Sequence, residues 1–158
     1  MATTSQKVSV FEKIGYSLGD LAANLVFQTL ITYLAYFYTD IYGLKSTDAS
    51  IIMLVVGLTA AFIFNPIIGV LADRTNSKWG KFRPWILWTA VPLGISLSLL
   101  FTSPNLSDTG KIVYAYATYL LFFFMYTANN IPYGALMAVM TGDDKERTSL
   151  GSYRMTGA

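Results

Sequence analysis

The sequence alternates between long apolar stretches and short polar segments. The apolar stretches cover residues 14–42, 49–72, 84–103 and 112–140. A helix needs about 20 residues to cross the hydrocarbon core of a bilayer, so each stretch is long enough to span a membrane. The pattern predicts an all-α membrane protein with four transmembrane helices, joined on one side by loops over residues 73–83 and 141–150.

The end of the sequence predicts the start of a fifth helix. Asp143 stands where a helix N-cap is expected, and Glu146 three residues later is placed to reach back to the amide of the cap residue. The chain would then contain four spans and the beginning of a fifth.

Composition supports a membrane protein and argues against an enzyme. Of the 158 residues, 54% are hydrophobic and 13% are charged, whereas a soluble domain carries about 25% charged residues. Cysteine and histidine are both absent, which removes thiol nucleophiles, histidine bases and the usual zinc ligands. We therefore expect no cofactor and no metal site. The net charge of +2 gives no reason to expect a nucleic-acid partner.

The basic residues predict the orientation in the membrane. All of them except Lys45 and Lys111 fall before the first span, in the loop 73–83 or after the fourth span. Cytoplasmic loops carry an excess of Lys and Arg. The N-terminus is therefore expected in the cytoplasm, and the lipid bilayer is the expected surrounding.

The first span carries a polar stripe made of Asp20, Asn24, Gln28 and Thr32. Residues four apart lie on one face of a helix. An Asp near the bilayer centre costs about 2.5–3.5 kcal/mol on insertion scales, so such a stripe is expected to face a bundle interior or a water-filled path. The alternative is that Asn24, Gln28 and Thr32 only hydrogen-bond neighbouring helices and that Asp20 lies near the cytoplasmic headgroups.

The second and fourth spans contain prolines beside asparagines, at Asn65-Pro66 and in the stretch 129–133 with Asn129, Asn130 and Tyr133. Proline leaves helix carbonyls without their usual donor at membrane depth, where the protein must satisfy them. Each proline either kinks its helix for structural reasons or helps to form a ligand site. The polar and aromatic side chains of 129–133 favour a ligand site there.

Tyrosines recur every seven residues in the fourth span, at Tyr119, Tyr126 and Tyr133. This spacing places them near one face of a helix. They suit either a sugar, with its apolar face and hydroxyls, or ordinary packing, and the sequence leaves both open.

Several segments together resemble a known transporter family. The loop residues Gly69 to Arg74 and Lys78-Trp79-Gly80-Lys81-Phe82-Arg83-Pro84-Trp85 are similar to the loop between helices 2 and 3 of the glycoside-pentoside-hexuronide cation symporters, in the major facilitator superfamily. Gly15 to Asp20, Tyr36 to Leu44, Asn130 to Gly134 and Asp144 to Arg147 also agree.

The resemblance implies a fold, a location and an activity. The family's transporters have twelve helices in two six-helix halves, with the sugar bound between the halves. This chain would then be an N-terminal portion in a bacterial inner membrane. It would need the remaining helices as partners to transport a sugar or glycoside by cation-coupled alternating access.

The resemblance also assigns residues. Asn24, Asn130 and Arg154 match the family's sugar-binding positions. Together with the stretches above, the residues expected to line the substrate path are Asp20, Asn24, Gln28, Asn129, Asn130, Tyr133 and Arg154. A cytoplasmic latch is expected from Asp73, Arg74, Lys81 and Arg83.

The coupling ion is where the chain departs from the family pattern. The two aspartates that bind the cation in sodium-using members fall at Ala61 and Asn65, and a nearby cation-site threonine matches Thr127. Sodium prefers hard anionic oxygens, so a proton is favoured, with Asp20 as the best embedded acid. The alternative to proton coupling is facilitated diffusion of the sugar without any coupling ion.

Two other classes of protein stay open on the sequence alone. One is a small four-helix protein that works as an oligomer, such as an exporter. The other is a membrane protein that assembles with partners and does not transport.

Overall fold

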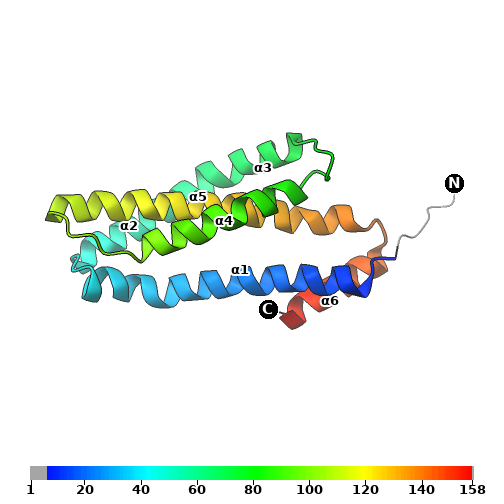
Figure 1. The fold of residues 1–158 in the computed structure, drawn as a ribbon, viewed down its shortest axis with the longest axis horizontal. Helices are drawn as coiled ribbons and strands as arrows, with labels where there is room; N and C mark the ends of the chain where they lie inside the picture. Colours follow the sequence, from blue (N-terminus) through cyan, green and yellow to red (C-terminus); the bar gives the residue numbers. More distant parts are fainter. Residues whose placement is uncertain (1–6, 158) are drawn as a thin grey trace. The chain divides into compact units, whose positions relative to one another are not determined.

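The computed structural model describes residues 7–157, and its elements are all helical (Figure 1). One short π-helical turn ends the first long helix, and a second interrupts the next. In chain order the elements are α1 (Val10–Tyr36), η1 (Phe37–Ile41), α2 (Ser46–Thr59), η2 (Ala60–Phe64), α3 (Asn65–Arg74), α4 (Arg83–Leu100), α5 (Asp108–Met140) and α6 (Asp144–Gly157).

The predicted membrane spans are confirmed in number, with different ends. Within the described residues, four helical segments are long and apolar enough to cross a bilayer: Val10–Ile41, Ser46–Arg74, Arg83–Leu100 and Asp108–Met140. The fifth helix begins at Asp144, so the predicted loop 141–150 is shorter than expected. The backbone N–H of Lys145 donates to Asp143 Oδ1 at 2.9 Å, which caps the new helix as predicted and lets it start early.

The chain divides into two compact units. The first contains Met1–Leu30 and Gly134–Ala158, and the second contains Ile31–Tyr133. Helices α1 and α5 therefore each contribute to both units.

The second unit has a core of aromatic and branched side chains. Fully buried members come from every long helix that passes through this unit: Leu34, Tyr38, Ile52, Val56, Ile68, Leu100 and Phe122. The ring of Phe64 packs edge-on against Phe124, with centroids 5.5 Å apart. Because lipid tails are as apolar as these side chains, van der Waals packing between the helices stabilises this core.

Helices α4 and α5 run antiparallel in the second unit. The Tyr114 hydroxyl donates to the carbonyl of Leu99 at 2.8 Å near one end. Near the other end, Asn129 Nδ2 donates to the carbonyl of Ile86 at 3.1 Å. The first contact joins the C-terminal end of α4 to the N-terminal part of α5, and the second joins the N-terminal end of α4 to the C-terminal part of α5. The two helices therefore lie side by side along most of the length of α4.

The π-helical turn η2 comes directly before Pro66. Proline has no N–H, and its ring crowds the carbonyl four residues earlier, here that of Phe62. A π-helical turn widens the helix at this point, and such turns are frequent at functional sites. Ala61 lies inside η2 and Asn65 begins α3, so both positions that match the family's cation site adjoin the distortion.

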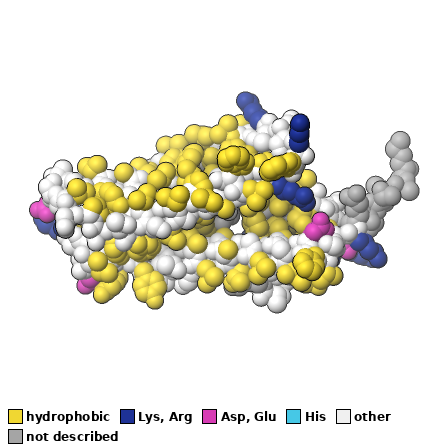
Figure 2. All heavy atoms as spheres, viewed as in Figure 1, with side chains coloured by type: hydrophobic (Ala, Val, Ile, Leu, Met, Phe, Trp, Pro, Cys, Tyr) yellow, Lys and Arg dark blue, Asp and Glu magenta, His cyan; other side chains and the backbone are white. Residues whose placement is uncertain are grey.

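Hydrophobic side chains also cover the outside of the helices. Figure 2 shows them along the helix flanks, while Lys and Arg side chains project at the loop between α3 and α4. Phe62, Trp88 and Val91 are 76%, 76% and 69% exposed. Apolar flanks of this kind suit lipid acyl chains.

The first unit pairs the early part of α1 with α6. Leu150 on α6 is fully buried. The Ser17 hydroxyl donates to the carbonyl of Tyr153 at 2.8 Å, and a Cβ on Gly151 would meet Met137 Cε at 3.7 Å. The end of α5 therefore packs close to α6 in this unit.

Candidate functional site

An ion pair between Asp20 and Arg154 joins α1 to α6 within the first unit. Arg154 Nε donates to Asp20 Oδ1 at 3.0 Å. Asp20 is only 7% exposed, and it lies inside a membrane-length helix. A buried carboxylate is costly unless it is paired, and Arg154 supplies the pairing charge. The sequence predicts that both residues line the substrate path, but no sequence pattern predicts that they pair.

The next residue of the polar stripe adds to this pair. Asn24 Nδ2 lies 3.4 Å from Asp20 Oδ2, a long hydrogen bond one helical turn along α1. The Asp20 carboxylate therefore has a cation on one oxygen and an amide on the other. Asn24, Gln28 and Thr32 are exposed, so the stripe continues along the surface of α1 beyond the ion pair.

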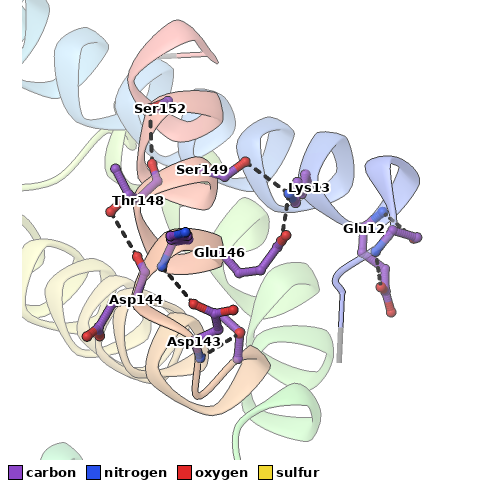
Figure 3. Close-up of polar contacts among 11 residues, drawn as sticks. Glu12, Lys13, Asp143, Asp144, Glu146, Thr148, Ser149 and Ser152 are labelled. Carbon is purple, nitrogen blue, oxygen red and sulfur yellow. Dashed lines mark hydrogen bonds and ion pairs between the residues drawn. The ribbon is translucent and has the colours of Figure 1, made fainter. Parts of the chain in front are cut away.

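A second ion pair lies closer to the start of α1 (Figure 3). Lys13 Nζ is 2.7 Å from Glu146 Oε2 and donates to the Ser149 hydroxyl at 2.9 Å. The Lys13 ammonium also lies 5.9 Å from the centroid of the Tyr153 ring. Lys13 is 8% exposed, so α1 contributes a buried cation at this level and a buried anion at Asp20.

This arrangement corrects the predicted role of Glu146. Its carboxylate pairs with Lys13, and the amide of Asp143 donates instead to the Thr141 hydroxyl at 3.1 Å. The reciprocal capping box occurs at the start of α1. There the Ser9 N–H donates to Glu12 Oε2 at 3.1 Å, and the Glu12 N–H donates to Ser9 Oγ at 3.2 Å. The Ser9 to Glu12 spacing is a sequence signal for this box.

The asparagines of α5 are held differently from each other. Asn129 Nδ2 donates to two groups of α4, the Ile86 carbonyl at 3.1 Å and the Thr89 hydroxyl at 2.9 Å. Asn130 Nδ2 donates within α5, to the Tyr126 hydroxyl at 2.9 Å. Both asparagines are half-buried.

Packing accounts for part of the predicted tyrosine series. Tyr119 is 4% exposed, and its ring packs edge-on against Tyr38 with centroids 6.5 Å apart. It also contacts Phe123 edge-on at 4.9 Å. Tyr133 is buried as well. Tyr119 therefore belongs to the core of the second unit, and Tyr126 is the member bonded to a candidate ligand residue.

The positions that match the family's cation site lie in different surroundings. Thr127 is buried on α5 at 4% exposure, whereas Asn65 is exposed at the start of α3. Among the described residues, no group of three or more Asp, Glu, His or Cys side chains is placed so that it could hold a metal ion.

Two of the four residues predicted to form the latch pair with each other, one at the end of α3 and one in the loop between α3 and α4. Lys81 Nζ lies 3.3 Å from Asp73 Oδ1, with the two side chains 37% and 71% exposed. Arg74 and Arg83 are exposed, and neither forms an ion pair among residues 7–157. Gly80 turns the loop with φ of +102°, a conformation that favours glycine.

The fold and these side chains together define the class of protein. The first of the four membrane-length helices carries the buried charges of Lys13 and Asp20, and the fourth carries the half-buried amides of Asn129 and Asn130. Charged side chains inside a membrane are rare unless they are functional. These are features of a multi-pass membrane protein with a polar interior.

Comparison with known sequences identifies the family. Residues 15–158 match the family MFS/sugar transport protein, and the chain belongs to it. The resemblance to the glycoside-pentoside-hexuronide symporters is thereby confirmed, as is its assignment to transporters and not to enzymes.

Three relatives show the extent of the similarity. The chain is 47% identical to the uncharacterized symporter YnaJ of Bacillus subtilis and 47% identical to the inner membrane symporter YicJ of Escherichia coli, in each case over 95% of this chain and 32% of the relative. It is 39% identical to the isoprimeverose transporter of Lactiplantibacillus pentosus, over 90% of this chain and 30% of the relative. The chain thus spans about a third of the length of these relatives.

Proposed function

We propose that this chain forms the N-terminal portion of a cation-coupled transporter for a sugar or glycoside. It would reside in the bacterial inner membrane with its N-terminus in the cytoplasm. The family, the symporter names of two relatives and the sugar named for a third support this proposal. The excess of Lys and Arg in the loop 73–83 supports the orientation.

The observation that carries the proposal is the buried pair between Asp20 and Arg154. The pair is neutral as a unit when the carboxylate is ionised and Arg154 occupies one of its oxygens. A proton on Asp20 would remove the charge that holds Arg154. The guanidinium could then donate to sugar hydroxyls or to a uronide carboxylate, because its N–H groups match such oxygens.

This exchange supplies a physical route to proton coupling. Sugar and proton stabilise the same state, in which the pair is open, so each raises the affinity for the other. The positions that match the family's sodium site are Ala61 and Asn65, which carry no charge. Alternating access would then carry the loaded site from one side of the membrane to the other.

The substrate path we propose uses the residues expected from the sequence. They are Asp20, Asn24, Gln28, Asn130, Tyr133 and Arg154. Neutral amides and a tyrosine suit hydroxyl-rich sugars, while Arg154 also permits uronides.

The experiment compares Asp20→Asn with the parent in the full-length transporter, in vesicles. Labelled sugars are screened by counterflow, and sugar-driven proton uptake is then measured with sodium and pH varied independently. Asp20→Asn should abolish proton uptake and keep counterflow. Asp40→Asn is the matched control, because Asp40 is an exposed acid in η1 whose carboxylate, among residues 7–157, accepts a hydrogen bond only from the neighbouring Thr39 hydroxyl, at 2.8 Å. Proton uptake that persists in Asp20→Asn would remove Asp20 from the coupling mechanism.

A further inference from the structure

A chain of residues crosses the second unit from α5 to the loop after α3, in two sets of hydrogen bonds that share Trp85. It begins at Asn129, whose amide donates to the Thr89 hydroxyl at 2.9 Å. That hydroxyl in turn donates to the carbonyl of Trp85 at 2.6 Å. The same amide nitrogen also donates to the carbonyl of Ile86 at 3.1 Å. A carbonyl only accepts, so this contact fixes which end of the Asn129 amide faces α4.

The first set ends at the backbone carbonyl of Trp85, and the second starts at the indole of the same residue and leads to the end of α3. The indole Nε1 of Trp85 donates to the Thr75 hydroxyl at 2.9 Å. Thr75 Oγ1 donates onward to the carbonyl of Leu71 at 2.8 Å. Both threonine hydroxyls therefore act once as acceptor and once as donor, so each link has a defined direction.

The two ends of this chain lie beside the two predicted functional regions. Asn129 precedes Asn130, the proposed sugar residue of α5. Thr75 follows Arg74 and starts the loop in which Asp73 pairs with Lys81. Thr89 is 8% exposed, so its bonds are largely shielded from water, where an unsatisfied hydroxyl or amide is expensive.

We propose that Asn129, Thr89, Trp85 and Thr75 form a positioning network that sets the conformation of the loop 75–82 according to the position of α5. Asn129 is then a positioning residue and not a sugar ligand, while Asn130 on the adjacent face of the helix is the ligand. The role of this network in transport rests on the proposed function. Its structural effect on the loop does not.

The test places a nitroxide spin label in the loop of the full-length transporter. Asn76→Cys is a suitable site because Asn76 is exposed and makes no side-chain hydrogen bond among the described residues. This chain contains no cysteine, so only cysteines elsewhere in the transporter need to be replaced. The electron paramagnetic resonance spectrum then reports the mobility of the loop.

Without any sugar, Trp85→Phe and Thr89→Val should each increase the mobility of the label. Thr89→Ser keeps the hydroxyl and should restore the parent spectrum. Trp88→Phe is the matched control, because Trp88 lies on the same helix, is 76% exposed and makes no side-chain hydrogen bond among residues 7–157. An unchanged spectrum in both Trp85→Phe and Thr89→Val would overturn the proposal.

A binding measurement separates the two asparagines. With isoprimeverose as the probe, Asn129→Ala should keep the dissociation constant within about threefold of the parent value and should increase loop mobility without sugar. Asn130→Ala should lose binding and keep the parent mobility. If Asn129→Ala leaves mobility unchanged, Asn129 does not position the loop and the proposal fails. If the parent protein binds and transports no sugar of a wider panel, the proposed function fails, and the sugar-free spectra still decide whether the network exists.

Discussion

Lys13 on α1 and Glu146 on α6 form an ion pair of 2.7 Å in which both charges are largely removed from solvent, with side-chain exposures of 10% and 19%. The pair lies beyond Asp20 and Arg154 along the same two helices. Two ion pairs of this kind fix the rotation of α6 relative to the early part of α1. A rotation of α6 would separate Lys13 from Glu146 and Asp20 from Arg154 at the same time, and it would leave the buried charges of α1 without partners. The proposed coupling residue Arg154 is thereby held at the level of Asp20.

Removing one partner of the Lys13 pair should destabilise the protein more than removing both. Lys13→Met leaves Glu146 charged and poorly solvated, and we expect a loss of about 3 kcal/mol. Adding Glu146→Gln should recover part of that loss, because the uncompensated charge is gone. The melting temperature of the full-length protein in detergent is the measurement. Equal melting temperatures for Lys13→Met and the parent would contradict the prediction.

The Asp73 to Lys81 pair should affect transport without affecting stability. Its side chains are 71% and 37% exposed, and exposed ion pairs contribute about 0–1 kcal/mol. Asp73→Asn should leave the melting temperature nearly unchanged. If the pair is a latch that differs between conformations, the initial rate of sugar uptake should change severalfold. An initial rate of sugar uptake equal to that of the parent would show that the pair has no gating role.

The positions of the helices were predictable because their signal is local. An apolar stretch of membrane length must be helical, since its backbone groups cannot hydrogen-bond to lipid. The residues at which the helices begin and end were predicted less accurately. The first turn of α6 forms within the predicted loop 141–150, because Asp143 caps a polar helix whose mean hydropathy gives no membrane signal.

The contacts within the candidate site were not predictable, because they join residues far apart in the chain. Lys13 and Ser149 are separated by 136 positions, and no pattern around either residue names the other. The two adjacent asparagines show a different limit. Successive residues on a helix point about 100° apart, so Asn129 faces α4 while Asn130 bonds within α5, and the sequence alone assigns both to one site.

Pro66 should be needed for the shape of the second span, whereas Pro84 should not. Pro66 follows η2 inside a span, and Pro66→Ala would return a donor to the carbonyl of Phe62 and favour a regular α-helix. We expect unchanged or raised thermal stability and a lower rate of sugar uptake. Pro84 lies in the first turn of α4, where a missing N–H is tolerated.

The comparison of the two proline variants is made on matched levels of protein in vesicles, with sugar uptake and melting temperature measured side by side. Pro84→Ala should behave as the parent in both. A Pro66→Ala variant with the parent uptake rate would show that the distortion at η2 is not required for transport.

Arg147 should stabilise the junction between α5 and α6, although it is exposed. Its Nε donates to the carbonyl of Thr141 at 3.2 Å, and its Nη2 donates to the carbonyl of Ala138 at 3.2 Å. These carbonyls lie at the end of α5, where helix carbonyls lack intrahelical donors and a cation also interacts favourably with the helix dipole. Arg147→Ala should therefore cost about 1 kcal/mol.

Lys145 provides the control for this last prediction. It is an exposed cation two residues earlier whose side chain makes no hydrogen bond or ion pair among the described residues, so Lys145→Ala removes the same charge without removing a cap. The melting temperature in detergent should fall for Arg147→Ala and stay at the parent value for Lys145→Ala. If the melting temperatures of both variants fall equally, the effect of Arg147 comes from the net charge at this turn and not from its two hydrogen bonds to the end of α5.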